Sequence, residues 1–390
     1  MSRALGCALL VFASACSEDL AEIEGYRGPV AYPNQRAEFA AKGRRLGYVA
    51  NRSSDTVSVV DLDSMTLLGS APVGRDPVDI DGPSSLVLDP ARGIAYVALS
   101  YPESIVSAHQ AAAGVEARFG YVQVLSLFDL TPLGELRVEA SATELALSRN
   151  GEQLLVSHSD RTRSSQVSAD IEVRRANLGL IGSPSEIVNR SAKLRLAKLC
   201  VVPSVIVYGK DDSRAFVLCA GEDSFAVVDT ADGAVLARVP SGASATNKPE
   251  AMVADASRER LLVSNQVSRS VVAFSASDSP QQLSVATITG LPRFAAFVSE
   301  SEFVVPSKDP DGLALVEVNS GAVVREVQFS VADCENPNDA QVTRDGRLYL
   351  VCEGTHYTPG AVVELDPTTL EVKGRVNVGI YPERLAILEP

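Results

Sequence analysis

The stretch 46-LGYVANRSSDTVSVVDLDSMTLLGSAPVG-74 contains three short apolar segments separated by polar turns. Its first segment ends in 48-YVAN-51, and a near-copy, 96-YVAL-99, follows later in the chain. Short Val-rich and Leu-rich runs that alternate with Gly, Asp, Ser and Pro turns are typical of β-strands, and no long stretch has helical periodicity. The sequence therefore predicts an all-β fold that is built from a repeat.

Two landmarks define this repeat. Elements similar to YVAN start 42 to 61 residues apart, and a Pro-x-x-apolar step marks the strand before them. The YVAN-like elements are 48-YVAN-51, 96-YVAL-99, 155-LVSH-158, 216-FVLC-219, 262-LVSN-265, 304-VVPS-307 and 349-YLVC-352. The Pro steps are 83-PSSL-86, 203-PSVI-206, 249-PEAM-252, 292-PRFA-295, 337-PNDA-340 and 382-PERL-385, and 142-ATEL-145 holds the same place without Pro. The strand at the Pro step and the three apolar segments that follow it give four antiparallel strands per repeat. Seven such repeats predict a seven-bladed β-propeller.

The two ends of the repeat array complement each other. The first repeat begins at its second strand, in residues 46–51, whereas the last Pro step, 382-PERLAIL-388, has no YVAN-like element after it. If the ring closes, residues 382–388 supply the missing inner strand of the first blade. This leaves fewer unpaired strand edges and ties the two ends of the propeller together.

The blades resemble those of the YVTN-repeat β-propeller family, which read approximately P-x-x-I-A-V-x-x-D-G-x-x-L-Y-V-T-N followed by T-V-S-V-I-D. The segment 46–74 is the most similar, and the resemblance covers residues 44–390, with long insertions in blades two and three. That family includes surface and periplasmic binding proteins, and related seven-bladed folds include lactonases. The resemblance implies a propeller whose role is either binding or catalysis.

Composition narrows the class of protein. The chain has 390 residues, 46% of them apolar, and contains no Trp. This is typical of a globular protein rather than a disordered one. The formal net charge is −14, and no dense run of Lys and Arg occurs. Because nucleic-acid binding depends on a basic surface, we expect no nucleic-acid partner.

The N-terminal stretch 1-MSRALGCALLVFASACSEDLAEIEG-25 has the pattern of an export signal. Arg3 precedes an apolar run that is too short to span a bilayer. The residues 13-ASAC-16 resemble the end of a bacterial lipoprotein signal, which implies a signal peptide in residues 1–15, a lipidated Cys16 and a polar tether up to residue 43. The alternative is an ordinary cleaved signal. We expect an exported protein of the cell envelope, anchored in the outer membrane and facing the periplasm or the surface.

Four cysteines follow the tether and occupy two repeat positions. Cys200 and Cys334 each lie three residues before a Pro step, whereas Cys219 and Cys352 each end a YVAN-like element. This arrangement favours within-blade disulfide bonds between Cys200 and Cys219 and between Cys334 and Cys352. An exported compartment permits their oxidation. A four-thiolate metal site is the alternative, although the two pairs belong to different blades and no CxxC spacing occurs.

Residues that follow the Pro steps are the candidates for a ligand site. The first two residues after each step are predicted to circle one mouth of the central channel, and they are polar and mixed in charge. Such a ring could form a funnel for a small polar ligand. The alternative is a structural role, because inner strands begin in solvent in any propeller. The charged candidates are Glu144, Glu250, Arg293, Asp339, Glu383 and Arg384.

A metal site is a further hypothesis. Three neutral imidazoles could bind a transition metal, and all the histidines of the chain are predicted to lie on the funnel face. They are His109, His158 and His356. The alternative is that they are ordinary loop residues, because the loops on this face are long. The acidic loop 75-RDPVDIDGP-83 is too short and irregular for a calcium loop of the EF type. No cofactor is expected, with a transition metal as the alternative.

The sequence contains no Gly-x-Ser-x-Gly, Walker or His-Glu-x-x-His motif. A catalytic site could still be assembled from scattered residues, and fold alone does not define function. The sequence favours a non-catalytic scaffold that binds a small ligand or an envelope protein. The alternative is an enzyme on the funnel face, similar to a lactonase, or a metal-binding protein.

Overall fold

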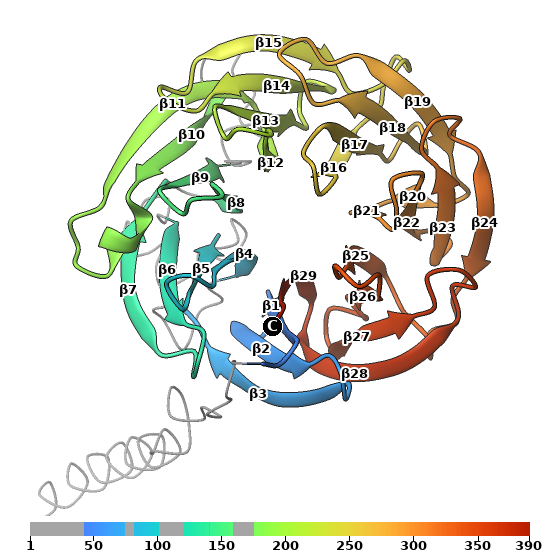
Figure 1. Cartoon of the computed structure of the whole chain (residues 1–390), viewed down its shortest axis with the longest axis horizontal. Helices are drawn as coiled ribbons and strands as arrows, with labels where there is room; N and C mark the ends of the chain where they lie inside the picture. The colour runs from blue at the N-terminus through green and yellow to red at the C-terminus, as the bar shows by residue number, and fades with distance from the viewer. Residues whose placement is uncertain (1–42, 75–81, 101–119, 140, 159–174) are drawn as a thin grey trace, which may run out of the picture.

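The computed structural model describes residues 43–74, 82–100, 120–139, 141–158 and 175–390. These residues form seven antiparallel sheets that stand side by side in a ring (Figure 1). They contain no α-helix, and so none that could cross a membrane. The prediction of a seven-bladed β-propeller is confirmed.

The strands of each blade follow one another along the chain from the axis outward, except that the last strand of the chain is the innermost one of blade one. Blade one holds β29 (Pro382–Leu388), β1 (Leu46–Asn51), β2 (Thr56–Asp61) and β3 (Thr66–Pro72). Blade two holds β4 (Pro83–Asp89), β5 (Ile94–Leu99), β6 (Tyr121–Ser126) and β7 (Pro132–Arg137). Blade three holds β8 (Ala142–Leu147), β9 (Gln153–His158), β10 (Arg175–Gly182) and β11 (Lys193–Val201), with a short 3-10 helix, η2 (Pro184–Ile187). Blade four holds β12 (Pro203–Tyr208), β13 (Arg214–Cys219), β14 (Ser224–Asp229) and β15 (Val235–Pro240).

Blade five holds β16 (Pro249–Ala254), β17 (Arg260–Asn265), β18 (Ser270–Ser275) and β19 (Gln282–Thr287). Blade six holds β20 (Leu291–Pro292) and β21 (Ala296–Phe297), then β22 (Glu302–Lys308), β23 (Gly312–Glu317) and β24 (Val323–Gln328). Blade seven holds β25 (Pro337–Val342), β26 (Leu348–Cys352), β27 (Pro359–Leu365) and β28 (Val372–Ile380). Each YVAN-like element lies in the second strand of its blade, as the repeat predicts.

The hydrophobic core lies between the blades. Seven clusters of buried side chains occur in the described residues, and each joins neighbouring blades. The second strands are the most enclosed, since every residue of β1 and β5 is buried. The outermost strand β24 is largely exposed. A second strand is covered on both faces by neighbouring blades, which is why it is a nearly continuous apolar run rather than an alternating one.

A repeated turn fixes the end of the ring where the inner strands begin, which we call the upper face. The residue before the inner strand is left-handed in six blades. In five of these, its carbonyl oxygen accepts a hydrogen bond from the N–H of the residue that follows the second strand. The pairs, donor first, are Arg52 and Tyr381, Ser100 and Gly82, Ala220 and Val202, Gln266 and Lys248, and Glu353 and Asn336. In these five blades, the residue after the YVAN-like element is thereby held beside the start of an inner strand.

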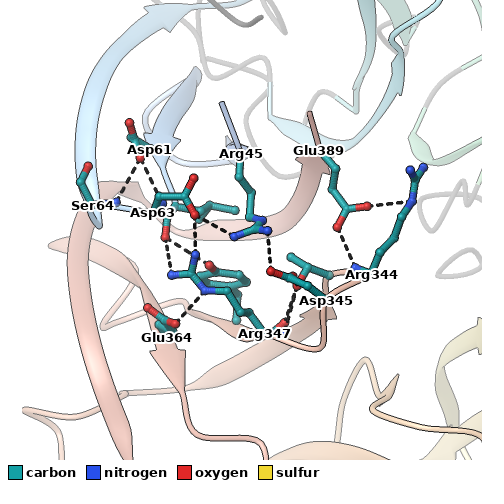
Figure 2. A network of polar contacts seen from close by, with 12 residues as sticks. Arg45, Asp61, Asp63, Ser64, Arg344, Asp345, Arg347, Glu364 and Glu389 are labelled. Carbon is teal, nitrogen blue, oxygen red and sulfur yellow. Dashed lines mark hydrogen bonds and ion pairs between the residues drawn. The ribbon is translucent and has the colours of Figure 1, made fainter. Parts of the chain in front are cut away.

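Ring closure occurs as the sequence predicts. Strand β29 pairs with β1, and Val49 lies opposite Leu385. On the lower face, polar contacts span the seam between blades seven and one (Figure 2). Arg45 bridges Asp63 and Asp345, at 2.7 Å to each carboxylate. Arg347 bonds Glu364 of its own blade at 3.0 Å and also reaches Asp63 in blade one.

Both predicted disulfide bonds are present, Cys200–Cys219 and Cys334–Cys352. Their placement differs in one respect from the prediction that both bonds lie within one blade. Cys200 belongs to β11, the outermost strand of blade three, so its bond links that blade to the second strand of blade four. The difference arises because β11 is long and leads almost directly into β12, without a separate loop.

Candidate functional site

The six charged candidates from the sequence form two layers at the upper face. Glu250, Arg293 and Glu383 occupy the first position after their Pro steps and form the mouth layer. The other three occupy the second position after the step, one residue deeper, and we call them the channel cluster. They are Glu144, Asp339 and Arg384.

Arg384 is the centre of the channel cluster. Its Nη2 lies 3.1 Å from Glu144 Oε2, and its Nη1 lies 3.4 Å from Asp339 Oδ1. Its guanidinium carbon also lies 3.6 Å from the centroid of the Phe294 ring. Arg384 comes from blade one, while these partners come from blades three, seven and six. The side chain therefore extends into the centre of the ring and ties its inner strands together.

The carboxylates of the channel cluster also have a structural role. Asp339 Oδ2 accepts a hydrogen bond from the Leu385 N–H at 2.9 Å. Ser85 Oγ accepts one from the Leu145 N–H at 3.3 Å and donates to Glu144 Oε1 at 2.6 Å. These bonds satisfy N–H groups on inner strands, whose inner edge has no partner strand. Burial is the main influence on both carboxyls, and it raises the pKa of Glu144 and of Asp339 despite the charge of Arg384.

A second cluster surrounds Glu353, whose side chain is fully buried. Lys308 Nζ lies 2.6 Å from Glu353 Oε2, and His356 Nε2 lies 2.8 Å from the same oxygen. The other oxygen, Oε1, has no hydrogen-bond partner in the described residues, and Arg293 Nη2 is 3.8 Å from it. We call Glu353, Lys308, His356 and Arg293 the mouth cluster.

Charge decides the ionisation state in the mouth cluster. Burial by itself would raise the pKa of Glu353, but the hydrogen bond from His356 and the charges of Lys308 and Arg293 outweigh it, so the pKa lies below the ordinary value. Burial and the nearby charge of Arg293 lower the pKa of Lys308, against the attraction of Glu353. Glu353 is therefore a carboxylate at neutral pH, and Lys308 is easier to deprotonate than a surface lysine.

His356 is held from two sides. Its ring stacks on Tyr381 with 3.7 Å between the centroids, and Nε2 is bonded to Glu353. The imidazole remains partly exposed. Next to it, Arg52 Nη1 bonds Glu383 at 2.8 Å, and Arg293 Nη1 bonds Glu250 at 2.8 Å. The mouth of the propeller thus carries one accessible imidazole beside a buried carboxylate and several fixed cations.

Sequence reasoning found Arg293 and His356 but missed Lys308 and Glu353. A signal was present, because Lys308 and Glu353 each directly follow a YVAN-like element, as Arg52 does. The upper-face turn holds Arg52 and Glu353 at the mouth, and the pairing of Lys308 with Leu291 places Lys308 beside the start of the inner strand in blade six. Charged residues at that position are therefore as informative as those that follow the Pro steps.

The two histidines that the structure describes lie in different blades. His158 is buried at the end of β9 in blade three, whereas His356 belongs to the mouth cluster in blade seven. His109, like the loop around Asp79, lies outside the described residues. The part of the chain that the structure describes contains no group of three or more His, Cys, Asp or Glu side chains arranged to hold a metal ion. The three-histidine hypothesis stays a prediction.

No protein-family model matches the chain, and no curated protein sequence matches it either. Solved structures do. The periplasmic gluconolactonase PpgL of Pseudomonas aeruginosa matches with a TM-score of 0.62 and 15% identity, over 88% of this chain and 99% of that one. A putative 6-phosphogluconolactonase from Bacteroides uniformis matches with a TM-score of 0.66 and 13% identity, over 88% of this chain and 100% of that one. Dihydro-heme d1 dehydrogenase NirN in complex with DHE matches with a TM-score of 0.57 and 15% identity, over 91% of this chain and 78% of that one.

At these identities the likeness defines the fold: a seven-bladed propeller with lactonase-like structural neighbours. It nevertheless corrects one expectation from the sequence. A non-catalytic scaffold was the favoured function, and that choice is wrong on these comparisons, because the neighbours favour the lactonase-like alternative. The residues alone favoured a scaffold because the sequence contains no linear catalytic motif. The disulfide bonds and the periplasmic neighbour agree with an exported protein.

Proposed function

We propose that this protein is an exported enzyme that hydrolyses a lactone at the upper mouth of its propeller. The observation that carries the proposal is the mouth cluster, in which an accessible imidazole is bonded to a buried carboxylate beside two cations. The lactonase-like structural neighbours support the reaction class. Residues that converge from different blades can form a hydrolytic site without any sequence motif.

His356 acts as the general base in this proposal. With Nε2–H donated to Glu353, the Nδ1 atom is left to accept a proton from a water molecule that attacks the lactone carbonyl carbon. Glu353 orients the ring and stabilises the imidazolium that forms. This arrangement of a histidine and a carboxylate follows the logic of hydrolytic triads, with water in place of the serine.

Lys308 and Arg293 stabilise the negative charge that develops on the carbonyl oxygen. Both are held by Glu353 and are largely shielded from solvent, so their charges act more strongly than they would in water. The tetrahedral intermediate collapses by breaking the bond to the ring oxygen. That oxygen takes the proton from His356, and the product is a hydroxy acid. Glu250 and Glu383 are proposed to accept hydrogen bonds from substrate hydroxyl groups at the same mouth.

The test is hydrolysis of gluconolactone and of 6-phosphogluconolactone by the purified chain, measured above the spontaneous rate. We expect His356→Gln to lower kcat by about 10²–10⁴-fold, the range for loss of a general base. Arg344→Ala, on the lower face, is the matched control and should keep full activity. Hydrolysis no faster than the spontaneous rate with a broad panel of lactones would overturn the proposal, as would a folded His356→Gln variant with unchanged kcat.

We also propose that Cys16 is lipidated and anchors the enzyme to a membrane of the cell envelope. The support is the sequence 13-ASAC-16 after a short apolar run, together with disulfide bonds that agree with export. Each buried CH₂ of an acyl chain contributes about 0.8 kcal/mol to membrane binding. Cys16→Ser should move the protein from the detergent phase to the aqueous phase with its thermal melt unchanged. A mutant that partitions like the parent would refute lipidation at this residue.

A further inference from the structure

A cavity occupies the central channel below Arg384. Its volume is about 480 Å³, within the range of about 300–1,000 Å³ that small-molecule sites have. It extends from Glu144 and Arg384 at its inner end to Pro90 and Arg258, which lie in turns at the lower ends of inner strands. The mouth cluster belongs to the opposite end of the channel, so this cavity is separate from the proposed active site.

The side chains of the cavity wall are mostly aliphatic. They come from inner strands of blades one to five, and one repeat position lines the wall in all five blades, as Ala386, Val87, Ala146, Val207 and Val253. Gln341 is the polar residue at that position, and its amide is bonded to Asp339 at 3.0 Å. Inner strands also present their free edges to the axis (Figure 1), so backbone carbonyl groups lie between these side chains.

The inner end of the cavity has more carboxylates than cations. Among the described residues, Arg384 is the one cation paired with Glu144 or Asp339. The neighbouring charges above are already matched, since Arg293 pairs with Glu250 and Arg52 pairs with Glu383. At the lower end, the guanidinium of Arg258 is paired with Asp212. A second cation at the inner end would meet a buried pair of carboxyl groups that Arg384 alone does not neutralise, and charge interactions with buried groups are stronger than in bulk water.

We propose that this channel cavity binds a primary alkylammonium ion that enters from the lower face. The ammonium group pairs with Glu144 at the inner end, and the aliphatic chain lies between Val207 and Val253. Backbone carbonyl groups on the free strand edges accept the remaining ammonium hydrogens. Burial raises the pKa of Glu144 and of Asp339, which agrees with a cluster that lacks one positive charge when it is empty.

The test is calorimetric titration of the purified full chain with n-hexylammonium, 1-hexanol and hexanoate at neutral pH. These probes share one chain and differ in charge. We expect hexylammonium to bind at least about tenfold more tightly than the other two, a difference of about 1.4 kcal/mol. Glu144→Gln should remove that preference while leaving the binding of hexanol unchanged.

A second variant tests the location. Val253→Phe narrows the cavity and should weaken the binding of hexylammonium at least about tenfold. Val324→Phe is the same change on the exposed outer strand β24 and should leave that affinity unchanged. Val207→Phe serves the same purpose if the first variant fails to fold. Three results would overturn the proposal: no binding by any probe, equal binding of hexylammonium and hexanol, or hexylammonium affinity unchanged when the cavity is narrowed.

Discussion

Two buried glutamates near the mouth are in opposite electrostatic situations. Glu353 has contacts with Lys308 and His356 and lies near Arg293, and these groups together lower its pKa. Glu144 shares one cation, Arg384, with a second carboxylate, and burial raises its pKa. The number of cations per carboxylate decides the direction, because both residues are almost completely desolvated.

This difference predicts opposite pH dependences of stability for two matched variants. A lowered pKa stabilises the fold above the ordinary glutamate value of about 4.3, and that stability is lost as pH falls through the folded pKa. The difference in unfolding free energy by which the parent exceeds Glu353→Gln should therefore become smaller as pH falls. A raised pKa stabilises the fold below the ordinary value, and that stability is lost as pH rises through the folded pKa. The unfolding free energy of Glu144→Gln should therefore increase relative to that of the parent as pH rises.

The measurement is urea unfolding of the parent and both variants at several pH values between about 3 and 8. The quantity compared is the difference in unfolding free energy between each variant and its parent. Differences that run parallel with pH for the two variants would contradict the assignment of charges in the two clusters. The binding and catalytic tests above do not depend on this result.

At the scale of the strand, β11 has two functions. It is the outermost strand of blade three, and its last residues turn toward the axis to begin blade four. Cys200 lies at this transition, where the chain passes from the rim of one blade to the inner strand of the next. Its bond to Cys219 therefore fixes the angle between two blades. Cys334, in the connection between β24 and β25, does the same before blade seven.

Removal of either disulfide should destabilise the protein by a similar amount. The two bonds close loops of 19 and 18 residues, and such loops correspond to about 3 kcal/mol in the chain-entropy model. The double variants Cys200→Ala/Cys219→Ala and Cys334→Ala/Cys352→Ala should lower the unfolding free energy accordingly in denaturant melts. Peptide mapping without reductant checks the pairing in the parent. Recovery of crossed pairs, or of four free thiols with bound zinc, is the result that would contradict it.

At the scale of the whole molecule, one seam closes the ring. All other blades follow one another along the chain, whereas blades seven and one also meet through β29 and the lower-face contacts of Figure 2. Arg347 is central to these contacts: its Nη2 donates to the Leu62 carbonyl oxygen at 2.9 Å, and its guanidinium carbon lies 5.4 Å from the centroid of the Tyr349 ring. Arg344, three residues earlier, is almost fully exposed.

Substitutions of these two arginines form a matched pair. Arg347→Ala removes partly buried, charge-assisted bonds across the seam and should cost about 1–3 kcal/mol of unfolding free energy. Arg344→Ala removes an almost fully exposed guanidinium that pairs with Glu389 and should change the unfolding free energy by less than about 0.5 kcal/mol. Thermal and urea melts of both variants would check this. Equal effects would show that the partly buried contacts of Arg347 contribute no more to stability than the exposed side chain of Arg344.

Deletion of residues 381–390 should destabilise the whole ring rather than fray one end. Strand β29 is the inner strand of blade one, and Leu385 is buried against blade seven as well. Loss of a buried side chain of this size costs about 1.5–3 kcal/mol, and the strand also provides Arg384 to the channel cluster. The variant should melt well below the parent in one transition. A control that lacks only residues 389–390 should stay close to the parent, and a melt of the longer deletion that overlays the parent would rule out closure by β29.

The sequence by itself determined the repeat, the number of blades, the closing strand and the pairing of four cysteines. Each follows from positions that recur along the chain, and in a propeller a repeat position maps directly to a height and a radius in the ring. For the same reason, the sequence could place Glu250, Arg293 and Glu383 at the mouth before any contact was known.

Only the tertiary structure decided which charges meet. Glu353 and Lys308 come from blades seven and six, and Arg384 reaches partners in three other blades. A linear repeat gives the height of each residue but not the direction of its side chain across the ring. The mouth cluster and the excess carboxylate of the channel therefore appear only when the blades are closed on one another, because ion pairing and desolvation depend on distances between segments that are remote in the chain.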